Sequence, residues 1–168
     1  MSKRLIIING PAGVGKTSIC KELYTKLDRS VWLDGDWCWM IHPFEVTDAN
    51  IRMAEKNISF MLQSFVDNPS IRNIIFCWVL HKEAIHERIF DSLSKIDCEM
   101  IRFSLLCSPE SLQQRMLHDN RNPVQISKSI SRLKLYQSMN TIKIDTTNKS
   151  IAMTVEAILQ RINHYNCG

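Results

Sequence analysis

A glycine-rich stretch near the amino terminus has the residue types and spacing of a phosphate-binding loop. Residues 10–17, GPAGVGKT, fit the pattern G-x-x-x-x-G-K-[ST], with an apolar run before them and a helical pattern after them. Glycines allow backbone dihedrals and close approaches that side chains block, so several amides can point at one phosphate group. The following helix adds its positive end. The residues expected to hold phosphates are Gly10, Gly13, Val14, Gly15, Lys16, Thr17 and Ser18.

Two side chains at the end of this loop predict a metal-bound nucleotide. Lys16 can reach β- and γ-phosphate oxygens, and the Thr17 hydroxyl can ligate Mg²⁺. We therefore expect a nucleoside triphosphate with magnesium. A glycine-rich turn that matches the pattern by chance is the alternative, and the strand-like and helical flanks argue against it.

Two carboxylates follow the second apolar run. Asp34 and Asp36 are separated by one glycine, and in a parallel sheet they would lie at the carboxyl edge, close to the γ-phosphate. One can hold the magnesium hydration shell while the other accepts a proton from an attacking hydroxyl. We expect Asp36 to be the base and Asp34 the metal-shell residue, although the sequence leaves open which of them touches magnesium. An Asp-Gly turn that begins a helix is the structural alternative.

Two absences narrow the class of nucleotide-binding protein. The run 74–79 carries no acid, whereas P-loop ATPases hold magnesium with an Asp there, which disfavours motors and AAA-type ATPases. Residues 147–151 superficially fit a guanine-binding N-K-x-D pattern, but position 151 is Ile. Guanine selectivity therefore has no support.

Arginines gather around a polar span at 118–129 that has no apolar periodicity until Ile130. Arg115 precedes this span, Arg121 lies in it and Arg132 follows it. Guanidinium groups that close over a transferring phosphoryl group stabilise its charge and exclude water. The span therefore predicts a mobile lid, with Arg115 and Arg121 as its catalytic arginines. Each arginine alone could equally be a solvated surface residue.

Length and composition favour one domain over residues 1–168 without a nucleic-acid or membrane partner. The chain has 168 residues and a formal net charge of +4, without the basic track that nucleic acid requires. The apolar run 5–8 is too short for a signal peptide or a membrane span. Six cysteines are scattered without paired spacing, as in small buried hydrophobes of a reducing compartment. We expect a cytoplasmic protein, with its oligomeric state open.

Apolar runs alternate with helical patterns, which predicts an α/β fold with a parallel sheet covered on both faces. The expected strands are 5–9, 31–34, 73–79, 100–106 and 141–144. The expected helices are 16–27, a longer one over the apolar positions 51–65, one from Ser108 and Pro109, and 151–162.

These motifs together resemble the small P-loop kinases of the nucleoside monophosphate, shikimate, gluconate and adenylyl-sulfate kinase superfamily. The similarity spans GPAGVGKT, LDGD at 33–36, the arginine-bearing lid and the segment 144–147. It implies a P-loop NTPase fold of three layers, whose five-stranded parallel sheet has the order 2-3-1-4-5. It also implies ATP as donor, with Asp145 and Thr146 beside the adenine. Chloramphenicol phosphotransferase and the tunicamycin-resistance ATP-binding protein are similar in size and layout.

The sequence departs from that superfamily at the expected acceptor site. Apolar and aromatic residues follow Asp36, where a charged acceptor would call for Arg or Lys. A hydroxylated small molecule with a flat apolar body would fit better, stacked on aromatic rings. The candidate pocket residues are Trp37, Trp39, Trp78, His81 and Arg132.

Three functions fit these features. The first is an ATP- and Mg²⁺-dependent phosphotransferase that moves the γ-phosphate to a hydroxyl. The second is an ATP-binding protein that sequesters a small ligand without transfer, and the third, ranked last for want of a basic track, is a polynucleotide 5′-kinase. The alternative to an aromatic acceptor site is that the aromatic residues after Asp36 simply fill the core beneath the second helix.

Overall fold

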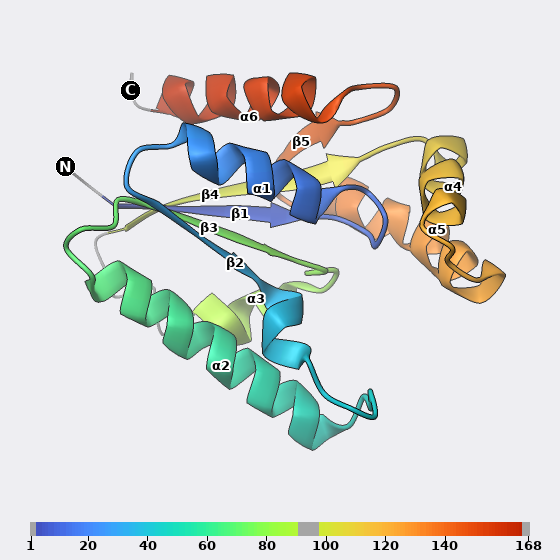
Figure 1. Ribbon diagram of the computed structural model, residues 1–168, viewed down its shortest axis with the longest axis horizontal. Coiled ribbons are helices and arrows are strands. Elements are labelled where there is room, and N and C mark those ends of the chain that lie inside the picture. Colours follow the sequence, from blue (N-terminus) through green and yellow to red (C-terminus); the bar gives the residue numbers. More distant parts are fainter. Residues whose placement is uncertain (1–2, 91–97, 166–168) are drawn as a thin grey trace.

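The computed structural model describes residues 3–90 and 98–165. Its centre is a five-stranded parallel sheet in the order β2-β3-β1-β4-β5, as expected (Figure 1). Each predicted strand is present, with ends shifted by two residues or fewer. The strands are β1 (Lys3–Asn9), β2 (Ser30–Asp34), β3 (Asn73–Trp78), β4 (Cys98–Leu106) and β5 (Ile142–Asp145).

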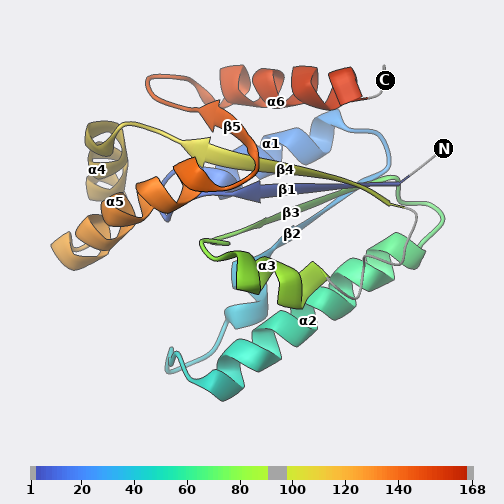
Figure 2. The ribbon, with the colours of Figure 1, turned by 180° about the vertical axis from the view of Figure 1, so that it is seen from behind.

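Helices cover both faces of the sheet and its carboxyl edge. Helices α1 and α6 pack on one face, α2 and α3 on the other, and α4 and α5 lie beyond the carboxyl ends of the strands (Figures 1 and 2). The helices are α1 (Lys16–Lys26), the 3-10 helix η1 (Gly35–Trp39), α2 (Asp48–Asp67), α3 (Glu83–Phe90), α4 (Pro109–His118), α5 (Pro123–Ser138) and α6 (Ile151–Tyr165).

Strand β1 divides the core between the two faces. Successive side chains of a strand point to opposite faces, so Ile6 and Ile8 join the cluster under α1 and α6, while Leu5 and Ile7 join the cluster over α2 and α3. All four are almost fully buried. The apolar run that predicts a strand is therefore continuous because both of its faces are covered.

The polar span at 118–129 differs from the aperiodic loop that the sequence predicts. Helix α4 ends at His118 and α5 begins at Pro123, so a short turn replaces most of the expected loop. The Asn122 side chain accepts from the Gln125 amide, and the Gln125 side chain accepts from the Asn122 amide, which makes a capping box. With proline at the first helical position, these local bonds start the helix before its apolar periodicity begins.

Three smaller points complete the fold. Helix α3 is absent from the elements that the sequence predicts, since it has only eight residues. Among the residues that the structure describes, Cys20, Cys77 and Cys107 are buried free thiols and Cys38 and Cys98 are partly exposed; Cys167 lies outside the described residues. No described helix is both long and apolar enough to span a membrane.

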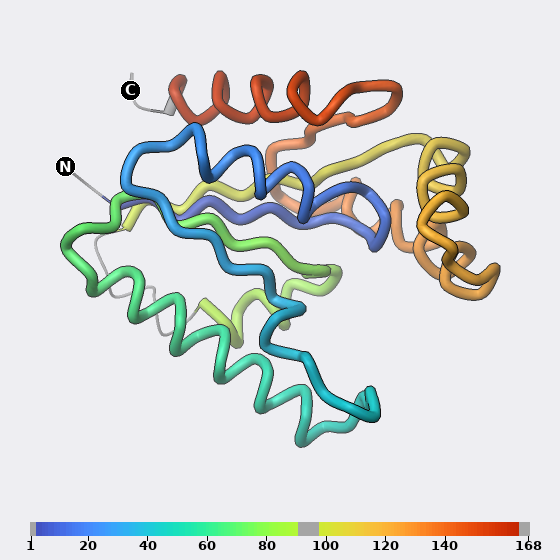
Figure 3. Tube along the Cα trace, viewed as in Figure 1, coloured from blue at the N-terminus to red at the C-terminus, as the bar shows by residue number. Residues whose placement is uncertain are grey.

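The tube in Figure 3 shows how the sheet gathers the predicted chemistry. The loop between β1 and α1, the turn from β2 into η1, and helices α4 and α5 all lie beyond the carboxyl ends of the strands. Segments far apart in the sequence therefore meet at one edge, as they do in other open parallel sheets.

Candidate active site

The loop between β1 and α1 has a backbone that requires glycine. Gly13 and Gly15 have φ angles of 81° and 102°, in the left-handed region. A Cβ atom on Gly13 would lie 2.4 Å from Cγ of Met116 on α4, so the loop also packs too closely for a side chain. Helix α1 begins after Gly15 without a side-chain cap, which leaves its first amides free for an anion.

Lys16 lies over this loop. Its Nζ donates to the carbonyl oxygens of Gly10 at 3.0 Å and Pro11 at 2.9 Å. Burial lowers the pKa of the Lys16 amine, and nearby charges, including those of Asp36 and Asp34, oppose that shift. The ammonium is therefore poised for an anion that would stabilise its charge.

Thr17 and Asp34 form the candidate metal site. The Thr17 hydroxyl donates to Oδ2 of Asp34 at 2.8 Å, while Oδ1 of the same buried carboxylate accepts from the Asp36 amide at 3.1 Å. Hydroxyl and carboxylate oxygens suit Mg²⁺, which usually keeps waters and shares phosphate oxygens. No described group of three His, Cys, Asp or Glu side chains could hold a metal. The donors present therefore fit a magnesium ion that arrives with a nucleotide.

Asp36 is exposed at the start of η1 and is oriented by Trp78. The Trp78 indole Nε1 donates to Oδ1 of Asp36 at 3.0 Å. Gly35 permits this approach, because a Cβ atom there would lie 2.4 Å from Cγ of Trp78. The carboxylate thus keeps one oxygen for a further partner while the indole fixes the other.

Eight predicted site residues line one cavity of about 210 Å³, here named the phosphate cavity. It lies between the loop and the turn that joins α4 to α5, and Val79, directly after β3, also borders it. The eight are Gly13, Gly15, Lys16, Thr17, Ser18, Asp34, Asp36 and Arg121, and Asp119 of the turn adds a third carboxylate. Cations and carboxylates around one small space are the groups that phosphoryl transfer requires.

Arg115 belongs to a neighbouring cavity of about 550 Å³, here named the base-side cavity. Its guanidinium donates to the Val14 carbonyl at 3.1 Å, to the Thr146 hydroxyl at 2.9 Å and to the Thr146 carbonyl at 2.7 Å. Gln114, Lys149 and Ile151 line the same cavity. Arg115 and Arg121, which the sequence groups as one pair, therefore lie in two different cavities.

Thr146 and Asp145, the two residues expected beside the adenine, also differ in their surroundings. Thr146 is buried and lines the base-side cavity. Asp145 is exposed, and its carboxylate accepts from the Thr147 amide at 2.9 Å. This hydrogen bond lowers the pKa of Asp145 and commits one of its oxygens to the turn.

A third cavity, of about 470 Å³, lies between η1, α2 and α3 and is here named the apolar pocket. Trp39, Trp78 and His81 of the candidate acceptor residues line it, together with Ile51 and Ile85. The ring centroids of Trp39 and Trp78 are 6.3 Å apart. Val79 borders both this pocket and the phosphate cavity, so the two are neighbours.

The other two candidate acceptor residues lie outside the lining of the apolar pocket. Trp37 is 51% exposed and packs against Trp32, with ring centroids 4.8 Å apart. Arg132 is half-buried on α5 and lies close enough for its charge to act on His81. Burial is the main cause that lowers the pKa of His81, and the Arg132 charge adds to the shift.

The sequence does not indicate an ion pair that closes one side of the apolar pocket. The Arg88 guanidinium donates to both oxygens of the buried Glu55 carboxylate, at 2.9 and 2.7 Å. Both residues line the pocket. They are 33 positions apart on two helices, so no local pattern could reveal the pair.

Fold and loop together define a P-loop protein of the kinase-like class, as the sequence predicts. A family model described as an AAA domain matches residues 6–137, more than half of the chain, and the chain belongs to that family. The argument against AAA-type proteins from the acid-free β3 is therefore wrong at the level of the family. Cytidylate kinase of Buchnera aphidicola is 28% identical over 116 residues, 66% of this chain and 50% of the relative. The chain spans half the length of that curated relative.

Solved structures of similar fold include several kinases. The tunicamycin resistance protein of Deinococcus radiodurans superposes with a TM-score of 0.71 at 19% identity, covering 95% of both chains. A gluconokinase from Sinorhizobium meliloti gives 0.71 at 18%, covering 98% of this chain and 97% of that one. Shikimate kinase from Acinetobacter baumannii, in complex with shikimate, gives 0.64 at 18%, covering 97% and 94%.

Proposed function

We propose that this protein is an ATP- and Mg²⁺-dependent phosphotransferase whose acceptor is a hydroxyl group of a small molecule. One observation carries the proposal: Asp36, in the phosphate cavity, accepts a hydrogen bond from Trp78, in the apolar pocket, at 3.0 Å. A hydroxyl presented from the apolar pocket would meet a carboxylate and the phosphate groups at the same border. General-base catalysis requires that proximity.

The chain's residues have distinct roles in this proposal. The loop amides and Lys16 hold the donor phosphates, and Thr17 and Asp34 hold the magnesium ion, which neutralises charge on the phosphate oxygens. Asp36 accepts the proton of the acceptor hydroxyl as the hydroxyl oxygen bonds to the γ-phosphorus. The bond from that phosphorus to the oxygen of the β-phosphate breaks at the same time. Arg121 offsets the charge on the transferring group. Arg115 and Thr146 support the adenine base of the nucleotide.

A hydroxyl acceptor is favoured over a phosphate acceptor by the way the arginine of the apolar pocket is held. Arg88 is the arginine among its described lining residues, and Glu55 holds it through two hydrogen bonds, while Lys82, also in the lining, is an exposed point charge. A guanidinium committed in this way is not available for bidentate recognition of a phosphate. The cytidylate kinase similarity therefore supports phosphoryl transfer, while the pocket favours a different acceptor.

Sequestration of a ligand without transfer is the second candidate. The fold similarity to a tunicamycin resistance protein keeps it open. The two functions differ in chemistry: a sequestering protein binds ATP and ligand cooperatively and forms no ADP. A lid over residues 118–129, which include Arg121, would serve either function.

The test is ADP release from Mg-ATP with a panel of hydroxylated metabolites and antibiotics, with Lys16→Ala as the blank. We expect acceptor-dependent ADP, which Asp36→Asn abolishes while ATP binding stays nearly intact. Full turnover by Asp36→Asn would contradict the role of that carboxylate. Cooperative ligand binding without ADP would establish sequestration instead.

A further inference from the structure

A continuous row of aromatic rings leads from the candidate base to the protein surface. The ring centroids of Trp78 and Trp39 are 6.3 Å apart, and those of Trp39 and Phe44 are 6.1 Å apart. Exposure rises along the row, from 9% for Trp78, beside Asp36, to 67% for Phe44. The rings therefore line a path that begins at the reacting edge and ends in solvent.

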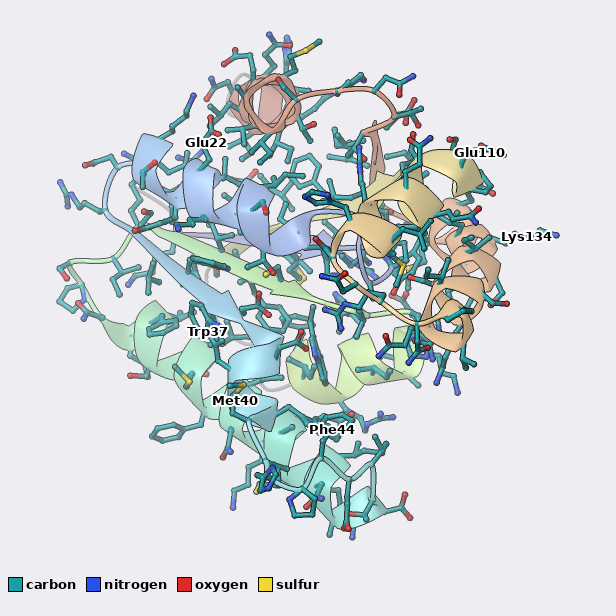
Figure 4. The ribbon with its side chains drawn as sticks, turned by 45° about the vertical axis from the view of Figure 1, so that its right-hand side comes forward. Glu22, Trp37, Met40, Phe44, Glu110 and Lys134 are labelled. Carbon is teal, nitrogen blue, oxygen red and sulfur yellow. The ribbon has the colours of Figure 1, made fainter. Side chains whose placement is uncertain are left out.

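The outer end of this path carries exposed apolar side chains. Met40 is 84% exposed and Val46 is 66% exposed, on the segment that carries Phe44. Figure 4 shows Met40 and Phe44 where η1 ends and the chain turns towards α2. We name Met40, Phe44 and Val46 the outer ridge. Large exposed apolar side chains that gather beside a cavity mark a binding surface.

The inner part of the path offers apolar walls and one paired charge. Ile51 of α2 and Ile85 of α3 line the apolar pocket together with the two tryptophans. At its side Glu55 and Arg88 cancel each other's charge, while Lys82 is an exposed cation of the lining. The complement of the apolar walls is an uncharged apolar group, because a charged one would lose its water there without gaining a partner.

We propose that the acceptor is an uncharged molecule with a hydroxylated head, an aromatic body that packs against Trp39 and Trp78, and an apolar extension that lies along the outer ridge. This inference rests on the proposed function for its hydroxyl head. It adds the substrate class: an elongated aryl compound, distinct from a sugar acid or a nucleotide. The hydroxyl lies at Asp36, and the extension leaves the pocket past Phe44.

A second aromatic row supplies a matched control. Trp37 packs on Trp32 with centroids 4.8 Å apart, and Trp32 packs on Tyr24 at 5.9 Å. Trp37 is 51% exposed, yet it is not among the residues that line the apolar pocket. Trp37→Ala thus removes an exposed ring from the 3-10 helix that also carries Trp39, without touching the proposed path.

The experiment measures binding of 1-(4-alkylphenyl)ethane-1,2-diols, from methyl to hexyl, by calorimetry. Mg²⁺ and the β,γ-imido analogue of ATP are present, and glycerol serves as the ring-free reference. We expect affinity to rise about two- to fourfold for each added methylene, the gain when that methylene is partly to fully buried. Phe44→Ala should flatten this rise for the longer chains and leave the methyl compound unchanged, and Trp37→Ala should leave the whole series unchanged.

Several outcomes would overturn the inference. One is that no compound of the series binds, and another is that affinity does not depend on chain length. Two more are that glycerol binds as tightly as the aryl diols, and that Trp37→Ala and Phe44→Ala flatten the rise of affinity with chain length equally. A Phe44→Ala variant that changes the sedimentation coefficient but not the rise would assign the ridge to contact between copies. ADP formation is scored separately: graded binding without ADP contradicts the proposed function alone, and ADP from small polyols without graded aryl binding contradicts the inference alone.

Discussion

Trp78 donates its indole N–H to Oδ1 of Asp36 at 3.0 Å, so the wall of one cavity orients the carboxylate of another. The two residues are 42 positions apart: Asp36 lies on η1, directly after β2, and Trp78 ends the neighbouring strand β3. A carboxylate on a short 3-10 helix would otherwise rotate freely. The indole therefore acts as a positioning group for the proposed base.

Trp78→Phe keeps an aromatic ring and removes this hydrogen bond. We expect turnover with the best acceptor to fall about tenfold, since a positioned general base contributes about 10²- to 10⁴-fold. Affinity for the ATP analogue should not change. Trp32→Phe is the matched control, because the Trp32 indole donates at 3.4 Å to Cys77 Sγ. Equal losses from both variants would contradict a specific role for Trp78.

Gly35→Ala tests the close packing that brings Trp78 to Asp36. The new Cβ would lie 2.4 Å from Cγ of Trp78, so the ring or the backbone must move. Overpacking of this kind costs about 1–3 kcal/mol of unfolding free energy, which urea denaturation would measure. In the double variant Gly35→Ala with Trp78→Leu, the smaller side chain should make the combined loss less than additive. Strict additivity would mean that the two residues do not clash.

Asp34→Asn tests the metal site. The amide keeps an oxygen for the Asp36 amide but removes the charge beside Thr17 that attracts a cation. We expect affinity for Mg-ATP to fall at least about tenfold, as for loss of a partly buried charge worth about 1.4 kcal/mol or more. Affinity for ATP measured in a chelator should not fall. A parallel loss in both conditions would mean that Asp34 supports the fold and not the metal.

The lowered pKa of Lys16 predicts how nucleotide affinity depends on pH. Burial favours the neutral amine in the free protein, whereas bound phosphates favour the ammonium and raise its pKa again. Protons are therefore taken up on binding once the free amine titrates, and affinity falls as pH rises through that lowered pKa. Calorimetry from about pH 7 to about pH 10, below the ordinary lysine value, measures this fall.

Lys16→Arg separates this titration from general effects of alkaline pH. A guanidinium stays charged throughout the range, so the variant should bind with an affinity that changes little with pH, even if that affinity is weaker. A fall in the variant as steep as in the natural protein would assign the titration to another group.

The sheet was predictable because its strands are buried runs with clear ends. Residues 5–8 and 74–77 are continuous apolar segments, and the glycine loop fixes where the first strand stops. The start of α5 was not found by periodicity, but its signal was present: Asn122-Pro123 followed by Gln125 is a capping sequence. Local hydrogen bonds determined that boundary.

The site was predictable where one motif holds several residues together, and less so where tertiary packing decides. GPAGVGKT and the two aspartates meet as the topology of a parallel sheet requires. Trp37 and Trp39 are two positions apart, yet one packs on Trp32 and the other on Trp78, because the turns of η1 separate them. The Glu55–Arg88 pair depends on how two helices pack, which no spacing encodes.

The Ser129 hydroxyl of α5 donates to the carbonyl of Ala12, in the middle of the phosphate loop, at 2.6 Å. Gly13 meets Met116 of α4 on the same side of that loop. Helices α4 and α5, which carry Arg115 and Arg132 and flank Arg121, therefore both contact the loop. Any movement of α5 either moves the loop with it or breaks the hydrogen bond between Ser129 and Ala12. Binding of the donor phosphates and opening of the site are therefore coupled.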